Sequence, residues 1–377
     1  MRKLLTLMKK EAMLAVSLLA ALGSLLITPP TAALLTAIDW KTLATLLMLL
    51  CVLDGFKTEK LFQPVIRLAG RFNTVLTMSL FLVFAVFLSS MFVTNDVSLL
   101  IFVPLTMMIF RAGGKERYTV PVLVLENIAA VRGSLLTPFG SPQNLFLFGQ
   151  SGMDALSFMG MMLPLWLGSA VLLAAFIAWM CRKDLRQPIR MEEATAGEAW
   201  ESDRRGKRAL YLGLFVLIVT TIVTRTPLWP YVTALVVALL LIFDRAVFRR
   251  VDYVLLLTFL CFFVFSSSIA ANEGISAFLM QSVKGNEYWW SLGLSQLISN
   301  VPASIVLWPF TDSLKALIYG LDTAGLITII GSLASVINIR LYTREYPGQG
   351  KRFMLWFEII SLAFFAIVVG PQWLMVR

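Results

Sequence analysis

Long apolar runs separated by short polar stretches cover almost the whole chain. A helix that crosses a bilayer needs about 20 mostly apolar residues. Runs of this kind lie near residues 12–28, 40–55, 73–93, 97–110, 119–148, 159–181, 209–224, 229–248, 253–271, 288–310, 322–340 and 354–375. The pattern therefore predicts an all-α polytopic membrane protein.

Two apolar regions are divided by polar residues at a point where the chain could turn back. Thr94-Asn95-Asp96-Val97 divides 73–110, and Ser299-Asn300-Val301-Pro302 divides 288–310. Irregular backbone at membrane depth is tolerated only where protein, water or a ligand satisfies its N–H and C=O groups. We expect both regions to be re-entrant hairpins.

Two further runs are interrupted by Gly, Pro and polar residues. Residues 133–144 interrupt the run 119–148, and a Gly-Ser-Leu-Ala-Ser sequence at 331–335 interrupts 322–340. We expect both runs to be broken helices with an unwound connection, which makes about nine true crossings in all.

The composition excludes several functional classes. The chain has 377 residues, of which 58% are hydrophobic and 14% are charged, and it contains no His. His-ligated metals and His general bases are therefore excluded. Cys51, Cys181 and Cys261 lie in apolar runs without C-x-x-C spacing, and no phosphate-binding G-x-x-x-x-G-K-[ST] motif occurs. We expect no enzymatic activity, no cofactor and no metal centre.

The basic residues indicate an orientation. The net charge of +10 is explained by Lys and Arg in cytoplasmic loops, so nucleic acid is not an expected partner. With nine crossings and two hairpins, most of the 32 basic residues fall on one side. This predicts an inner-membrane protein with its N-terminus inside and its C-terminus outside. The few outer basic residues are Lys41, Arg225, Lys284, Lys315 and Arg377.

The order of features repeats along the chain. Ile38-Asp39-Trp40 and Val251-Asp252-Tyr253 each precede a span, a divided region, an interrupted run and a last span. We paired the Gly-Ser-Leu at 133–135 with that at 331–333, followed by Asn144 and Asn338. An odd number of crossings separates Asp39 from Asp252, which predicts an inverted repeat.

This repeat divides the chain into five parts. They are a first span at 1–37, repeat 1 at 38–181, a cytoplasmic linker at 182–208, connecting spans at 209–250 and inverted repeat 2 at 251–377. Paired broken helices of opposite orientation indicate the binding site of a secondary transporter, because helix N-termini bind anions and unwound oxygens bind cations.

At these motifs the chain resembles the ion transporter superfamily, which includes arsenite permeases, citrate–metal symporters and divalent anion:sodium symporters. The matching motifs are Thr94–Val97, residues 133–144, Ser299–Ser304 and residues 331–335. The resemblance covers Ile38 to the C-terminus and is greatest to small bacterial anion transporters. It implies a homodimer in which a transport domain of hairpins and broken helices slides as an elevator along a scaffold.

Carried over residue by residue, the resemblance implies a site for a small solute and for a coupling ion, Na⁺ or H⁺, at the hairpin tips. Its residues are Thr94, Asn95, Asp96, Arg132, Gly133, Ser134, Thr137, Pro138, Gly140, Ser141, Pro142, Gln143, Asn144, Ser299, Asn300, Val301, Pro302, Ser304, Gly331, Ser332, Ser335 and Asn338.

Arg132 departs from the family pattern. The family often has Ala-Asn-x-Gly-Ser where this chain has Ala130-Val131-Arg132-Gly133-Ser134. A charge at membrane depth is costly and indicates function. Our hypothesis is that Arg132 replaces a bound Na⁺ or pairs with an anionic substrate. The alternative is a structural ion pair with Glu126 or Asp96.

The remaining acids leave two functions open. Asp96 could relay protons or cap the second hairpin arm, and Asp39 and Asp252 are expected to cap helices. We expect a secondary active transporter of a small anionic solute. The alternative is a Na⁺/H⁺ or other cation/proton antiporter of the same fold.

Overall fold

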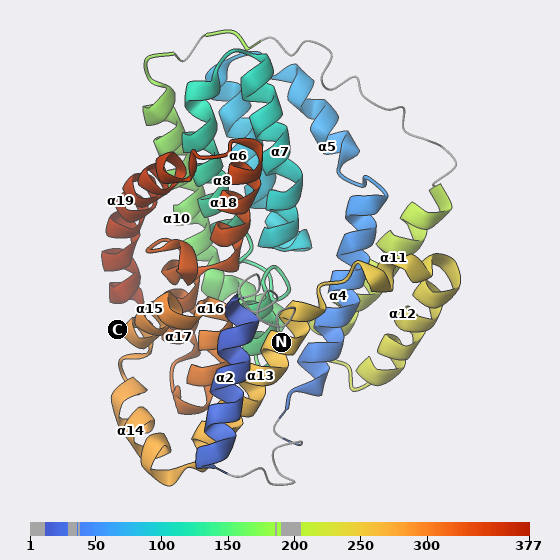
Figure 1. The fold of residues 1–377 in the computed structure, drawn as a ribbon, viewed down its shortest axis with the longest axis vertical. Helices are drawn as coiled ribbons and strands as arrows, with labels where there is room; N and C mark the ends of the chain where they lie inside the picture. Colours follow the sequence, from blue (N-terminus) through green and yellow to red (C-terminus); the bar gives the residue numbers. More distant parts are fainter. Residues whose placement is uncertain (1–11, 29–35, 37, 185–186, 190–204) are drawn as a thin grey trace.

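The computed structural model describes residues 12–28, 36, 38–184, 187–189 and 205–377. This part of the chain forms an elongated bundle of α-helices without a β-strand (Figure 1). The all-α prediction is therefore confirmed for the described residues. The basic N-terminal segment and most of the 182–208 linker lie outside them.

Helices of very different length follow one another. The first eight described are α2 (Ala12–Ile27), α4 (Trp40–Thr58), α5 (Gln63–Leu68), α6 (Val75–Val93), α7 (Asn95–Ala112), α8 (Thr119–Gly133), α9 (Pro142–Ser151) and α10 (Ala155–Cys181). The others are α11 (Arg205–Val223), α12 (Trp229–Asp244), α13 (Tyr253–Ala271), α14 (Glu273–Val283), α15 (Glu287–Ile298), α16 (Asn300–Leu307), α17 (Leu314–Ala324), α18 (Leu333–Glu345) and α19 (Gly350–Val376).

Seven described helices are long and apolar enough to cross a membrane, which makes the chain a multi-pass membrane protein. They are α6, α7, α10, α11, α12 with the turn that follows it, α13 and α19. This set differs from the nine crossings predicted from the sequence. It includes both arms of the first hairpin, and it lacks the two broken helices and the predicted spans at 12–28 and 40–55. The number of crossings stays a prediction.

Each predicted hairpin turns at a single residue. Thr94 separates α6 from α7 with φ 68° and ψ 156°, and Ser299 separates α15 from α16 with φ 70° and ψ 158°. Residues other than Gly rarely adopt this backbone conformation, which costs about 1–3 kcal/mol. Figure 1 shows α6 and α7 in one half of the molecule and α15 and α16 in the other.

The predicted helix caps are confirmed. The Asp39 carboxylate accepts a hydrogen bond from the Thr42 N–H at 2.9 Å before α4. Asp252 accepts one from the Leu255 N–H at 3.1 Å before α13. Their backbone angles also agree, with φ −80° and ψ 82° at Asp39 and φ −78° and ψ 84° at Asp252. The two helices therefore start in the same way.

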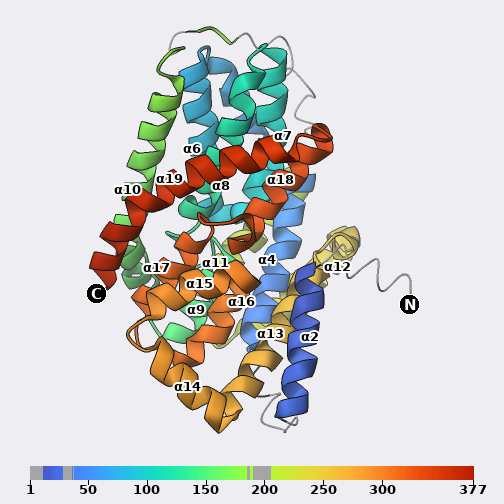
Figure 2. The same cartoon turned by 60° about the vertical axis from the view of Figure 1, so that its left-hand side comes forward.

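The apolar core has two parts, which lie one above the other in Figure 2. One contains residues of α6, α7, α8, α18, α19 and the second half of α10. The other contains residues of α4, α9, α11, α12, α13, α15, α16 and α17. Trp166 of α10 packs against both parts, so α10 joins them.

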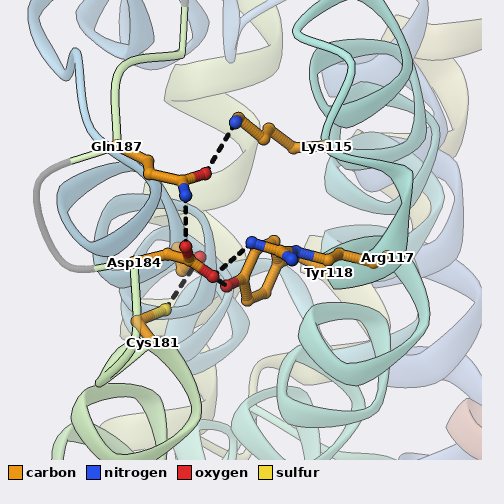
Figure 3. A network of polar contacts seen from close by, with 7 residues as sticks. Lys115, Arg117, Tyr118, Cys181, Asp184 and Gln187 are labelled. Atoms are coloured by element: carbon orange, nitrogen blue, oxygen red, sulfur yellow. Dashed lines mark hydrogen bonds and ion pairs between the residues drawn. The ribbon is translucent and has the colours of Figure 1, made fainter.

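A polar network connects the α7–α8 connection with the residues that follow α10 (Figure 3). Asp184 accepts hydrogen bonds from Tyr118, Arg117 and Gln187. Lys115 Nζ donates to Gln187 Oε1 at 2.7 Å. The Tyr118 hydroxyl and the nearby Arg117 hold the pKa of Asp184 below its usual range. The network ties the residues after α10 to the α7–α8 connection.

Candidate functional site

The two unwound connections share a motif, Thr-x-x-Gly-Ser. It is Thr137 to Ser141 before α9 and Thr328 to Ser332 before α18. In each, the Gly N–H donates to the Thr carbonyl, at 3.4 Å and 3.1 Å. In each, the Ser is the extended N-cap residue, with φ −146° at Ser141 and −147° at Ser332. The two connections are therefore structurally equivalent.

This equivalence corrects the pairing that we made from the sequence. Gly133 ends α8 and Ser134 follows it, whereas Gly331 and Ser332 lead into α18. The counterpart of Gly331-Ser332 is therefore Gly140-Ser141. Gly-Ser occurs twice in the first connection, and only the Thr three residues before Gly140 distinguishes the correct copy.

Each connection is held by the first arm of a hairpin, three residues before its turn. Thr137 Oγ1 donates to the Met91 carbonyl at 2.5 Å. Thr328 Oγ1 donates to Gln296 Oε1 at 2.7 Å, and Gln296 Nε2 donates to the Ala324 carbonyl at 3.1 Å. Hairpin and connection therefore form one unit in each half.

Glycine is required in both connections by close backbone approach. A Cβ at Gly140 would lie 2.1 Å from the Ser134 carbonyl oxygen, and one at Gly331 would lie 2.3 Å from that of Ala324. Each carbonyl therefore lies against the glycine of its own connection. Two residues before them stand Arg132 and Asp322, so the ends of α8 and α17 carry opposite charges.

Arg132 is fully buried and reaches from the end of α8 to the end of α17. Its Nε donates to Ser169 Oγ at 2.9 Å. Its Nη1 donates to the Asp322 carbonyl at 3.3 Å and to Thr323 Oγ1 at 3.1 Å. Its Nη2 has no hydrogen-bond partner among the described residues. The guanidinium thus bridges the two broken helices.

Asp322 is the acid that faces this cation, and sequence reasoning missed it. Gln143 Nε2 donates to its Oδ1 at 3.0 Å, while its Oδ2 has no partner in the described part of the chain. The predicted pairing of Arg132 with Glu126 or Asp96 is wrong, because Glu126 accepts from Thr106 instead. Asp322 is the first residue of the apolar run 322–340, and an acid that borders such a run is the signal that would have identified it.

A second missed residue, Gln372 of α19, continues the network. Thr323 Oγ1 donates to Gln372 Oε1 at 2.5 Å, and the Tyr288 hydroxyl donates to the same atom at 3.2 Å. Its Nε2 has no partner among the described residues. The network therefore links α8, α17, α15 and α19, and nothing in the predicted motifs pointed to α19.

A cavity of about 160 Å³ opens at the tip of the first hairpin. One wall comes from α7, α9 with the residues before it, and α18, and the other from α4 and α13. The cavity is lined by Leu46, Leu49, Leu50, Leu53, Thr94, Asp96, Val97, Leu100, Phe139, Ser141, Pro142, Leu145, Asp252, Leu255 and Ile337. The N-terminal ends of α7 and α9 both reach it, and helix N-termini offer free N–H groups and a positive dipole end to an anion.

Asp96 does not cap α7, which was one of the two roles predicted for it. The helix begins at Asn95, whose side-chain oxygen accepts from the Asp96 N–H at 3.0 Å. Asp96 lies in the first turn, and its buried Oδ1 has no partner among the described residues. Its carboxylate therefore lines the cavity together with that of Asp252.

The cavity gathers only part of the predicted site. Ser299 and Asn300 are buried at the second hairpin tip but do not line it. Ser335 accepts from Asn127 at 2.9 Å, and Asn338 Nδ2 donates to the Leu123 carbonyl at 2.7 Å. These residues join α18 to α8 in the packed interior.

Comparisons with known proteins agree with one another. A family profile described as citrate transporter matches residues 4–330. The chain is 31% identical over 316 residues to inner membrane protein YbiR of Escherichia coli, covering 81% of this chain and 80% of that protein. It is 28% identical over 335 residues to an uncharacterized transporter of Methanocaldococcus jannaschii, covering 88% and 89% of the two chains.

Proposed function

The chain belongs to the citrate transporter family, and from this premise we propose that it is a secondary active transporter that carries a small anion across the inner membrane. The observation that carries the proposal is the cavity where the N-terminal ends of α7 and α9 converge. These ends supply N–H groups and partial positive charge for a carboxylate or similar anion.

We propose an elevator mechanism for this transport. The moving unit is α6 to α10 with α15 to α19, and the scaffold is α2, α4 and α11 to α13. The cavity supports this division, because its lining comes from both groups. The matched turns at Thr94 and Ser299, in opposite halves of Figure 1, support an inverted repeat. The resemblance stated above also favours a homodimer.

Asp96 and Asp252 are proposed to hold the coupling cation. Both line the cavity, and no Lys or Arg among the described residues does so. Two carboxylates near each other favour binding of a proton between them. The same observation favours the second candidate function, a cation/proton antiporter, in which these acids would carry the ions and no anion would move.

Arg132 is proposed to act as a fixed cation rather than as a ligand of the solute. It is absent from the cavity lining, and it donates to oxygens of Ser169, Asp322 and Thr323. Such oxygens are also ligands for Na⁺. A guanidinium at this point holds the two broken helices together without a bound metal ion.

Flux into proteoliposomes tests the proposed function. We would measure uptake of radiolabelled citrate under imposed Na⁺ and pH gradients, with other small anions as competitors. Uphill anion uptake is expected. Asn95→Ala and Asn300→Ala, at the two hairpin tips, should abolish uptake while the protein remains folded. The exposed Asn286→Ala, just before α15, is the matched control and should transport normally.

Two results would overturn this function. Normal uptake in both tip variants would reject the proposed role of the two hairpin tips in transport. Proton movement that depends on Na⁺ but not on any anion, in the wild-type protein, would replace anion transport by cation/proton antiport.

A further inference from the structure

A second cavity, of about 200 Å³, lies where the start of α4, the end of α9 and the turn after α11 meet. Two basic residues, Lys41 and Arg225, line it together with Thr42, Thr45 and Gln150. Both belong to the few basic residues that the charge pattern assigns to the outer face. Leu145 of α9 lines this cavity and the one at the first hairpin tip, and α4 contributes residues to both.

Lys41 is not neutralised in this cavity. It is half-buried, and no hydrogen bond or ion pair of its side chain occurs within the described residues. The acid in the lining, Asp39, is already engaged: it accepts from the Thr42 N–H at 2.9 Å, from Thr42 Oγ1 at 2.6 Å and from Gln150 Nε2 at 2.8 Å. The Lys41 ammonium therefore keeps its donors for another group.

Arg225 is held in place by backbone geometry and by α9. Its φ of 52° is left-handed. Its Nη2 donates to the Phe148 carbonyl and to Ser151 Oγ, and the guanidinium lies 4.2 Å from the centre of the Phe148 ring. Its Nε is buried and has no partner in the described chain. One donor of a fixed cation is therefore unused.

We propose that Lys41 and Arg225 form an anion-binding site in this second cavity, separate from the one at the first hairpin tip. The ligand class is a small anion with a carboxylate or an inorganic oxyanion group. The two cations outweigh the single Asp39 carboxylate in the lining, and a net positive charge in a partly enclosed space attracts such a group more strongly than it would in open water. We assign this site the role of collecting the transported anion next to α9. Only this role, and not the binding itself, rests on the proposed function.

A cysteine reporter tests binding without any flux. Gly149 is exposed and lines the cavity, and a Cβ there would be 3.6 Å from Thr42 Oγ1, an ordinary contact. In a background with the three native cysteines replaced, we would follow the reaction of Gly149→Cys with N-ethylmaleimide in nanodiscs. Citrate and phosphate would be added at constant ionic strength, with gluconate as the reference salt.

Citrate or phosphate should slow the labelling at least about threefold. Adding Lys41→Gln or Arg225→Gln should remove this protection. Lys284→Gln is the matched control and should keep the protection. Lys284 does not line the cavity, and its Nζ pairs with Asp312 Oδ2 at a distance of 3.0 Å. Equal labelling with and without both anions, or protection that survives Lys41→Gln, would overturn the site. Because no transport is measured, either result is independent of whether the protein carries anions.

Discussion

Arg132 and Asp322 place opposite charges at the ends of the two broken helices, deep inside the molecule. A single charge buried there would cost several kcal/mol unless it were paired or hydrogen-bonded. Arg132 has the carbonyl of Asp322, two hydroxyls and the facing carboxylate, whereas Asp322 has Gln143 and the guanidinium. The two residues therefore depend on each other.

This dependence predicts a non-additive pair of substitutions. Arg132→Leu leaves the Asp322 carboxylate without its cation, and we expect the free energy of unfolding to fall by about 3–5 kcal/mol. Adding Asp322→Asn should recover a large part of that loss. Thermal and denaturant unfolding of the purified variants would measure both changes. Strictly additive losses would contradict the proposed pairing.

The same residue decides the response to sodium. If the guanidinium replaces a metal cation, wild-type flux should not depend on Na⁺. A variant with a small neutral residue, Arg132→Ser, should lose flux and regain part of it when Na⁺ is added. Uptake in Na⁺, K⁺ and choline media gives the comparison. Strict Na⁺ dependence of the wild type would reject the fixed-cation role.

Residue-level prediction from the sequence identified one partner of this pair. Arg132 was noticed because it departs from a family motif, and its burial follows from its position in an apolar run. Asp322 was missed because it stands at the start of its run, where an acid is easily taken as a helix end. The packing of α8 against α17 decides which of the buried acids faces Arg132. This contact joins residues 190 positions apart in the sequence, Arg132 and Asp322.

At the scale of elements, each unwound connection depends on a glycine that lies against a carbonyl. Gly140→Ala would place a Cβ 2.1 Å from the Ser134 carbonyl oxygen, and Gly331→Ala would place one 2.3 Å from the Ala324 carbonyl oxygen. We expect both to abolish flux and to lower the melting temperature. Gly149→Ala, in α9 where a Cβ would make only an ordinary contact with Thr42, should be stabilising by about 0.5–1 kcal/mol.

These three variants would be compared by citrate uptake and thermal unfolding. Similar damage from Gly140→Ala and Gly331→Ala is the expected sign that the two connections are equivalent. A normal protein with Ala at either position would contradict the geometry described above.

The polar network around Asp184 predicts that the attachment of the residues after α10 to the α7–α8 connection depends on pH. Because the folded-state pKa of Asp184 is lowered, its ionised form stabilises the fold above the unfolded pKa of about 3.9. That contribution is lost as the pH falls through the lower folded value. The Ile189 N–H, which donates to the Asn73 carbonyl at 2.9 Å, reports on the attachment.

We therefore expect amide exchange at Ile189, corrected for its intrinsic rate, to be constant from pH 9 to 5 and to rise below about pH 4. Asp184→Asn should raise it throughout this range. Asp154→Asn, which removes a charge at the opposite end of α10 but keeps an acceptor for the Ser157 N–H, serves as the control. Unchanged exchange in Asp184→Asn would mean that the network does not hold this segment.

Most elements could be predicted from apolar periodicity and its interruptions. Pro138 and Pro142 mark the first break, and the polar tetrapeptides mark both hairpin turns. The helix register within the connections could not be predicted, because it is fixed by contacts of Thr137 with Met91 and of Thr328 with Gln296.

At the scale of the whole molecule, the proposed moving unit and the scaffold meet at the cavity between α7, α9, α4 and α13. The order of elements was visible in the sequence as a repeat of motifs. How the halves pack was not visible, since the cavity lining combines residues from 46 to 337. The elevator account requires that α7 moves along α4 during each cycle.

A reversible cross-link between these two helices tests that requirement most directly. Leu50→Cys on α4 and Val97→Cys on α7 line the same cavity, and Hg²⁺ can bridge them in a background without native cysteines. The control pair, Ser89→Cys with Ser98→Cys, lies within the first hairpin, where the two hydroxyl oxygens are 2.9 Å apart. Bridging Leu50→Cys to Val97→Cys should stop citrate uptake and thiol reduction should restore it, while the control pair transports when bridged. Full uptake with α4 and α7 completely cross-linked would contradict the account.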